Sequence, residues 1–400
     1  MTESPRAAVP RRVLPVLVAA QFAGTSLWFA VNAVMPDLQR ELGWPAAAVG
    51  TLTSALQLGF IAGTLVFALL ALADRLPARA LFLGCSLAGA AATVGAWAGV
   101  RDFEALLAWR FLTGFCLAGI YPVGMKIASQ WFPRGLGAAL GLLIGALVLG
   151  SASGHLLRGL AGSLPWPSVM LGVAVLAALG GIGLYRGLPE PPHRSAASGA
   201  RPAGAGLQWR ALASLWTDRR VRASVFGYFG HMWELYTVWV LVPLILATRL
   251  HGTVLSLAAF GVLGAGAVGC VGGGLLASRL GSARVAGAQL AISGLCCIAA
   301  PWCLAAPAPV FALWLAVWGV TVAGDSPQFS ALTATNAPPG AVGSVLTLTN
   351  CIGFTISIVS IELHLRLAQA LPLAQLLPWI GLGPLFGLLM LSPLLRGRAG

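Results

Sequence analysis

Twelve apolar runs, each about 20 residues or longer and separated by short connectors, dominate this sequence. A run of this length is long enough to cross a bilayer as a helix, and one compact soluble core has no need for so many. Of the 400 residues, 58% are hydrophobic and only 9% are charged, whereas a soluble domain carries about 25% charge. The pattern excludes a soluble enzyme, a disordered protein and a nucleic-acid binder, and it predicts an all-α membrane protein.

The runs fall into two groups of six, divided by a segment rich in Pro, Gly, Ala, Ser and Arg. We therefore expect an N-terminal six-helix bundle (1–188), a linker loop (189–221) with a short amphipathic helix from Leu207 to Trp216, and a C-terminal six-helix bundle (222–400). The predicted spans are 13–36, 46–72, 80–100, 104–128, 135–157, 165–188, 222–249, 253–277, 284–304, 309–333, 341–364 and 371–395. The first run exceeds the 7 to 15 residues of a signal-peptide core, so we interpret it as a retained helix.

Basic residues are distributed unevenly over the connectors. If both termini and every second loop lie on one side, that side holds 18 of the 24 Lys and Arg residues, the other side holds five, and Arg110 lies inside a helix. The positive-inside rule then predicts that both termini and the linker are cytoplasmic, in a bacterial-type inner membrane. The net charge of +13 is thus interpreted as a topology signal.

The two halves also resemble each other in sequence, which is the signature of a duplicated transporter bundle. At a shift of 205 the fourth predicted helix aligns with the tenth, and the identical pairs include Trp109 and Trp314, Gly114 and Gly319, Gly119 and Gly324, and Pro122 and Pro327. Because Gly and Pro set close packing and helix breaks, we expect two pseudo-symmetric bundles of the same shape. A GxGxxG match over residues 264–269 lies inside a predicted helix, so we interpret it as a helix-packing face.

Several segments resemble the major facilitator superfamily of secondary transporters. ALADRLPAR (71–79) is similar to that family's loop between helices 2 and 3, GGGLLASRLGSAR (272–284) is its second-half counterpart, and Arg110 with Gly114 matches a helix 4 motif. The resemblance implies two bundles that rock about a central site. It also implies a cytoplasmic gating loop, whose residues are Asp74, Arg75, Arg79, Arg279 and Arg284. The helix dipole would favour Asp74 near the start of helix 11, and the basic residues could bind neighbouring helix ends. The alternative is that these are plain loop charges that orient the chain.

Ionisable residues inside a membrane span are costly, so each is a functional candidate. Glu234 lies near the middle of helix 7, and His231 lies one turn earlier on the same face, so the two could share a proton or form a structural pair. Asp325, in helix 10, is a second candidate for proton coupling or for an ion pair between bundles. Arg110 suits a structural or charge-relay role, and Lys126 suits either the membrane interface or the cavity.

Aromatic and amide side chains at internal depths are candidates for the lining of a central cavity. These residues are Trp28, Gln57, Tyr121, Trp233, Tyr236, Gln328 and Asn350. Each of them also suits a packing or interhelical role. We expect no metal, no cofactor and no nucleic-acid partner, and the expected partners are a small solute, protons and lipid, with the chain as a monomer.

Together these features predict a proton-coupled secondary transporter that works by alternating access on a small organic solute. Arg110 and Lys126 favour an anionic solute, and His155, where drug and proton antiporters of the family usually carry proline, disfavours a drug exporter. A proton-driven exporter of amphipathic or cationic compounds is the alternative, favoured if Glu234 and Asp325 face the cavity without basic partners. A membrane-embedded enzyme and a non-transporting receptor of the same fold are remote alternatives.

Overall fold

The computed structural model describes residues 9–45, 47–132, 136–162, 164–189, 207–208, 213–338 and 340–396. In this part of the chain the regular structure is helical, without strands. The first half contains α1 (Val13–Thr25), α2 (Ala30–Leu42), α3 (Ala48–Leu69), α4 (Leu72–Arg75), α5 (Ala78–Ala98), α6 (Phe103–Leu117), α7 (Tyr121–Trp131), α8 (Leu136–Ala161) and α9 (Pro167–Gly187). The second half contains α10 (Ser214–Thr217), α11 (Arg219–Ala247), α12 (Gly252–Leu280), α13 (Ser282–Ala305), α14 (Ala308–Gly324), α15 (Ser326–Asn336), α16 (Val342–Leu367), α17 (Leu373–Ile380) and α18 (Leu382–Arg396).

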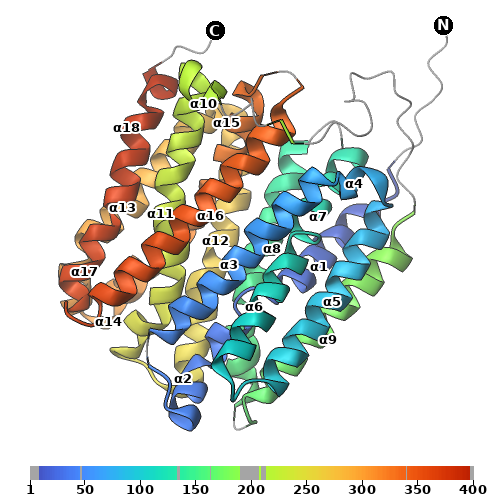
Figure 1. Cartoon of the computed structure of the whole chain (residues 1–400). Helices are drawn as coiled ribbons and strands as arrows, with labels where there is room; N and C mark the ends of the chain where they lie inside the picture. The colour runs from blue at the N-terminus through green and yellow to red at the C-terminus, as the bar shows by residue number, and fades with distance from the viewer. Residues whose placement is uncertain are drawn as a thin grey trace, which may run out of the picture.

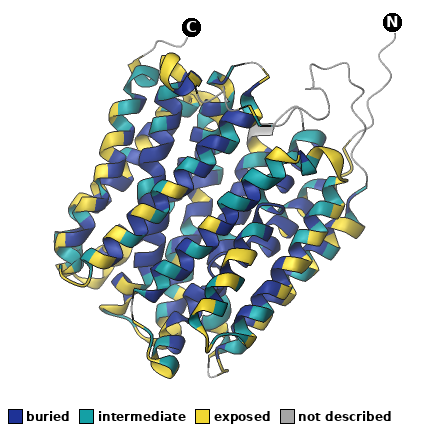
Figure 2. Ribbon diagram, viewed as in Figure 1, coloured by how far each residue is buried: buried dark blue, intermediate teal, exposed yellow. Residues whose placement is uncertain are grey.

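In the described part of the chain, twelve spans are long and apolar enough to cross a membrane, as the sequence predicts. Four of them consist of two consecutive helices, namely α1 with α2, α6 with α7, α14 with α15, and α17 with α18. Large apolar side chains such as Leu160, Leu295 and Trp302 remain more than half exposed, which suits a surface in contact with lipid. Figure 2 shows such exposed positions along the outside of the helices and buried positions along the inside.

The helices form two bundles that stand side by side (Figure 1). Across their interface α3 packs against α16, and α8 packs against α12. The short helices α4 and α10 and the end of α18 lie at one end of the molecule, which we call the terminal face (Figure 1). The other end is called the opposite face.

The two bundles share one helix break, in the fourth and the tenth spans. In the fourth span α7 begins at Tyr121, and in the tenth span α15 begins at Ser326, which is 121 plus the predicted shift of 205. A Cβ atom on Gly114 would lie 1.8 Å from the Leu56 carbonyl oxygen, and one on its counterpart Gly319 would lie 2.2 Å from the Val262 carbonyl oxygen. Both glycines therefore permit the same close approach of two helix backbones, and the predicted pseudo-symmetry is confirmed.

The GxGxxG segment is a packing face, as predicted. It lies inside α12, where a Cβ on Gly269 would meet the Val320 carbonyl oxygen at 1.8 Å and one on Gly266 would meet Ala323 at 2.7 Å. Here the lack of a side chain serves the contact between α12 and α14.

The linker is described only in part. Residues 190–206 and 209–212 lie outside the described residues, as do Arg134, Arg194, Arg201 and Arg210, which contributed to the charge count. Of the helix expected from Leu207 to Trp216, the described part shows α10, which begins at Ser214. The backbone N–H of Gln208 donates to Ser344 Oγ at 3.0 Å, so this part of the linker rests against the start of α16.

Candidate functional site

A cavity of about 480 Å³ lies between the two bundles on the side of the terminal face. The first half contributes α3, the segment around α4, and α7, and the second half contributes α16. Leu207 of the linker also lines it. Two charged residues are found among its described lining residues, Asp74 and Lys126.

A second cavity of about 40 Å³ lies deeper, and it shares Tyr121 and Asn350 with the first. Its polar lining residues carry hydroxyl, indole or amide groups, without a charged side chain among those described; they are Tyr121, Tyr228, Tyr236, Trp239, Ser326, Ser330 and Asn350. The two cavities share wall residues and mark a route between the bundles from the terminal face toward the middle of the protein. The route has an amphipathic, largely neutral lining.

An aromatic layer closes this route toward the opposite face. Its members come from both halves and are Trp28, Phe29, Phe60, Tyr236, Trp239 and Phe354. Trp28 stacks on Tyr236 with 5.9 Å between ring centroids, and Phe60 lies 4.7 Å from Phe354. Ring pairs at these separations are attractive beyond the area they bury, so the layer is a cohesive barrier.

Polar contacts between α3 and α16 reinforce the closure. Ser54 Oγ donates to Glu362 Oε1 at 3.0 Å, and Gln57 Nε2 donates to Ser357 Oγ at 3.3 Å. Each bond joins the first half to the second, so both must break before the bundles can separate at the opposite face. The conformation is therefore open toward the terminal face and closed toward the opposite face.

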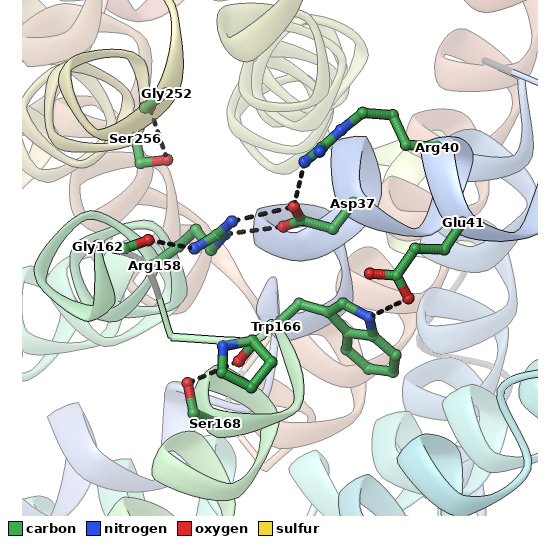
Figure 3. A network of polar contacts seen from close by, with 10 residues as sticks. Asp37, Arg40, Glu41, Arg158, Gly162, Trp166, Ser168, Gly252 and Ser256 are labelled. Carbon is green, nitrogen blue, oxygen red and sulfur yellow. Dashed lines mark hydrogen bonds and ion pairs between the residues drawn. The ribbon is translucent and has the colours of Figure 1, made fainter.

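A further polar network lies at the opposite face within the first half (Figure 3). Arg158 donates two hydrogen bonds to Asp37, from Nε to Oδ2 at 2.7 Å and from Nη2 to Oδ1 at 3.0 Å. Arg40 also contacts this carboxylate. Trp166 Nε1 donates to Glu41 at 2.9 Å. These bonds tie α2 to α8 and to the start of α9, which makes this corner of the first bundle a fixed unit.

At the mouth of the larger cavity, Lys126 forms an ion pair with Asp74. The ammonium nitrogen lies 2.6 Å from Asp74 Oδ1, and Lys126 also donates to the Ala73 carbonyl oxygen. Lys126 thus lines the cavity, as one of its two predicted placements required, but its charge is matched there. The expected position of Asp74 near the start of the eleventh span, which is α16, refers to a state closed at this face and stays a prediction.

Among the other predicted gating residues, Arg79 contacts a neighbouring helix end. Its guanidinium donates to the carbonyl oxygens of Tyr185, at 3.3 Å, and Leu188, and it lies 5.5 Å from the Tyr185 ring centroid. Arg75 and Arg279 are exposed at the ends of α4 and α12. Arg284 lines a separate pocket at the terminal face.

Arg110 is buried and binds backbone rather than an acid. Its guanidinium donates to the carbonyl oxygens of Trp28 at 2.6 Å and Leu27 at 3.3 Å. These residues lie in the break between α1 and α2, where carbonyl groups lose their helical partners. Arg110 therefore stabilises the break that places Trp28 in the aromatic layer, and it lies outside the lining of both cavities.

Glu234 lies in the interior of the second bundle. Ser293 Oγ donates to its Oε2 at 2.8 Å, and its Oε1 accepts from Trp318 Nε1 at 2.9 Å and from Cys297 Sγ at 3.3 Å. The sequence marked Glu234 by its depth but indicated none of these donors, which belong to α13 and α14.

His231 pairs with Asp325. Its Nδ1 lies 2.8 Å from Asp325 Oδ1, an ion-pair separation without hydrogen-bond alignment, and both side chains are buried. The expected pairing of His231 with Glu234 is wrong, because His231 pairs with Asp325, at the break between α14 and α15. Glu234, His231 and Asp325 are buried and are not among the residues that line the two described cavities, whereas their chain neighbours Leu235, Met232 and Ser326 line the smaller one, so we place the three behind the cavity wall.

The seven predicted cavity residues divide by position. Tyr121, Tyr236 and Asn350 line the cavities, and Trp28 belongs to the aromatic layer. Gln57 bridges the two halves, and Trp233 packs against His364 with its ring 5.6 Å away. Gln328 is buried in α15, and it and Trp233 are not among the residues that line the two described cavities.

Most of the cavity face of α11 was not expected from the sequence. Tyr228, Met232, Leu235 and Trp239 line the smaller cavity and recur every three or four residues, so they share one helix face. That spacing is readable in the sequence, as is the pair Ser326 and Ser330, one turn apart. The stripe contains no acidic or basic side chain, so the cost of burying a charge gave no signal there.

Comparisons with known proteins agree with this architecture. The sequence matches the family model of the Major Facilitator Superfamily over residues 17–361. It is 31% identical over 289 residues to a chloramphenicol resistance protein of Streptomyces lividans, covering 72% of this chain and 70% of that protein. It is 25% identical to the uncharacterized MFS-type transporter YybF of Bacillus subtilis, over 46% of this chain and 45% of that protein.

Solved transporter structures have the same fold. The MFS transporter FucP in the outward conformation superposes with a TM-score of 0.67 at 14% identity, covering 96% of this chain and 99% of that chain. The human organic anion transporter MFSD10 superposes with a TM-score of 0.70 at 16% identity, covering 97% of this chain and 100% of that chain. At these identities the likeness concerns the fold alone.

Proposed function

We propose that this chain, which belongs to the Major Facilitator Superfamily of transporters, exports uncharged amphipathic solutes with an aromatic part in exchange for protons. Export would proceed by alternating access, with the present conformation open to the cytoplasm at the terminal face. This assignment of sides follows the positive-inside prediction.

The choice of solute rests on one observation, the charge of the cavity lining. Asp74 and Lys126 are the charged residues among the described lining, and they neutralise each other at the mouth. The inner part is lined by aromatic rings, hydroxyl groups and the Asn350 amide. An apolar pocket with a few hydrogen-bonding groups suits a neutral solute that buries a ring and bonds through its polar end.

The same contacts argue against the anionic solute expected from the sequence. That expectation depended on Arg110 and Lys126 facing the cavity as free positive charges. Arg110 is instead engaged by two backbone carbonyl groups, and Lys126 is engaged by Asp74. A cationic solute is equally unsupported, because Glu234 is bound by Trp318 and Asp325 is paired with His231, and neither carboxylate lines the cavities.

The direction of transport is suggested by the relative from Streptomyces lividans, whose name describes chloramphenicol resistance. Removal of the drug from the cell is one way for a transporter to confer resistance. Chloramphenicol is itself uncharged and aromatic, and so agrees with the lining of the cavity.

Proton coupling is assigned to the buried groups of the second bundle. Glu234 and Asp325 bring two negative charges when ionised, and His231 brings at most one positive charge. A neutral interior therefore requires two protons distributed over three sites, and release of one leaves a buried net charge, which is costly. Movement of Ser326 and Met232 with the solute would change access to these sites.

The test is solute counterflow in proteoliposomes, which does not depend on the orientation of the inserted protein. Radiolabelled chloramphenicol is the probe, with benzoate as an anion and tetraphenylphosphonium as a cation. We expect exchange of chloramphenicol, and about tenfold slower exchange in Tyr121→Leu, which loses a cavity ring and hydroxyl. Phe111→Leu, at a 41% exposed position, is the matched control and should exchange normally. If the protein exchanges benzoate but not chloramphenicol, the solute is an anion and the proposal is wrong.

A further inference from the structure

A pocket of about 660 Å³ lies at the terminal face of the second bundle, separate from the transport route. It lies between the start of α11, the turn from α12 to α13, the end of α15 and the end of α18. Four arginines line it, and we call it the arginine pocket: Arg219, Arg220, Arg284 and Arg396.

The charge of the arginine pocket is not compensated by the protein. Its described lining residues include no carboxylate, and the four guanidinium groups are exposed and form no ion pair with a described residue. Asp218 is adjacent in sequence, but its side chain accepts from the backbone N–H groups of Arg220 and Val221 and caps α11. Four like charges around one hollow repel each other, so an anion there would be stabilising.

The first bundle provides an internal control. Arg79 occupies the position of Arg284 at the repeat shift of 205, since 79 plus 205 is 284. Arg79 is satisfied by the carbonyl oxygens of Leu188 and Tyr185 at the end of α9. Arg284 forms no such bond with a described residue, and it lines one pocket with three further arginines, so the second bundle has an open cationic site where the first has an internal contact.

The remainder of the lining is suited to an amphiphile. Leu280, Leu332, Pro393 and Leu394 add apolar surface beside the guanidinium groups, and Leu280 is 50% exposed. Ser282, Thr335 and Asn336 add neutral hydrogen-bonding groups. A phosphate attached to an acyl chain would use both parts of the wall, whereas a free phosphate would use only one.

We propose that the arginine pocket binds the phosphate headgroup of an anionic phospholipid from the leaflet at the terminal face. The guanidinium groups bind the phosphate oxygens, and the acyl chains lie along the leucines at the edge of the bundle. The bound lipid would brace the ends of α11, α13 and α18 against one another. This inference does not depend on the identity of the transported solute.

The test compares lipids by native mass spectrometry and by thermal unfolding of the purified full chain in detergent. Phosphatidylglycerol is the anionic probe, phosphatidylcholine is the zwitterionic control, and sodium phosphate is the free anion. We expect phosphatidylglycerol to remain bound and to raise the Tm, and neither control to do so. Arg284→Gln with Arg396→Gln should weaken phosphatidylglycerol binding about tenfold or more.

Arg11→Gln with Arg12→Gln is the matched control, because it removes two exposed charges from the N-terminal segment and not from the pocket. It should leave phosphatidylglycerol binding unchanged. Without lipid this control should unfold at the parent's temperature, and the Arg284 and Arg396 variant at or slightly above it, because the loss of two like charges relieves repulsion. Equal binding of phosphatidylcholine, or full retention of phosphatidylglycerol by the Arg284 and Arg396 variant, would overturn the proposal. If sodium phosphate raises the Tm as much as phosphatidylglycerol does, the site takes free phosphate and the lipid assignment fails.

Discussion

The two bundles share one plan of helices and differ in where they place charge. In the first bundle, Asp37 with Arg158 and Asp74 with Lys126 pair near the two faces. In the second, Glu234, His231 and Asp325 are buried in the interior, and the arginines at the terminal face remain unpaired with described residues. The first bundle thus uses its charges to fasten helices, and we propose that the second uses its charges to bind protons and lipid.

Arg110 sharpens this contrast because it is the deeply buried cation of the first bundle. Its position in the second bundle, by the shift of 205, is occupied by Leu315. Arg110 stabilises a broken helix, and the second bundle has no break in α11, its counterpart of the α1 and α2 span. The duplication preserved the packing of the helices, whereas each half acquired its own polar contacts.

The largest expected effect separates the carboxylates of the two bundles. Asp325→Asn removes a proposed proton site, so we expect proton-driven accumulation of solute to fall by about 100-fold while counterflow persists. Asp37→Asn, its control in the first bundle, should retain coupling, because this carboxylate serves Arg158. Solute-driven proton movement in proteoliposomes measures both. If Asp325→Asn still couples solute transport fully to protons, Glu234 and not Asp325 is the proton-coupling carboxylate.

Arg110→Gln tests whether the buried cation of the first bundle is structural. It leaves the carbonyl groups of Leu27 and Trp28 with a weaker partner or none, so we expect the free energy of unfolding to fall by about 2 to 4 kcal/mol. Arg110→Lys should recover part of that loss. Thermal unfolding in detergent gives the comparison, and normal stability combined with lost coupling would instead indicate a charge-relay role.

Gly114→Ala and Gly319→Ala test the shared packing of the halves. Each new Cβ would collide with a carbonyl oxygen, at 1.8 and 2.2 Å, so both variants should lose about 1 to 3 kcal/mol of stability. Gly84→Ala and Gly272→Ala, which meet no atom within 4 Å, are the controls. A loss in one half only would show that the two glycines are not equivalent.

The contacts between the halves should give the smallest effect. Ser54→Ala removes one bond to Glu362, so we expect a shift of about 0.5 to 1 kcal/mol toward the conformation open at the opposite face. Spin labels at positions 101 and 366, on exposed residues of different halves, should report a larger population of long distances. An unchanged distance distribution would mean that the aromatic layer and the Gln57 to Ser357 bond suffice to hold this side closed.

The sequence predicted features that depend on composition and on matched spacing. Run length determined the twelve spans, and glycines at a constant shift determined the repeated packing of Gly114 and Gly319. The depth of Glu234 and Asp325 could be counted along their helices, and both are buried. These inferences use only the position of each residue along the chain, because the rise per residue of a helix and the small size of glycine do not depend on neighbouring helices.

What the sequence alone determined is therefore a duplicated bundle of twelve membrane-length spans, with ionisable groups at depths that can be counted along them. Only the tertiary structure decided that His231 meets Asp325, that Arg110 meets the Trp28 carbonyl, and that Asp74 and Lys126 cancel at the cavity. The physical reason is that a membrane helix is apolar on the lipid side and on the packed side alike. Its rotation about its own axis is then weakly encoded in the hydrophobic pattern, and rotation decides which polar groups meet.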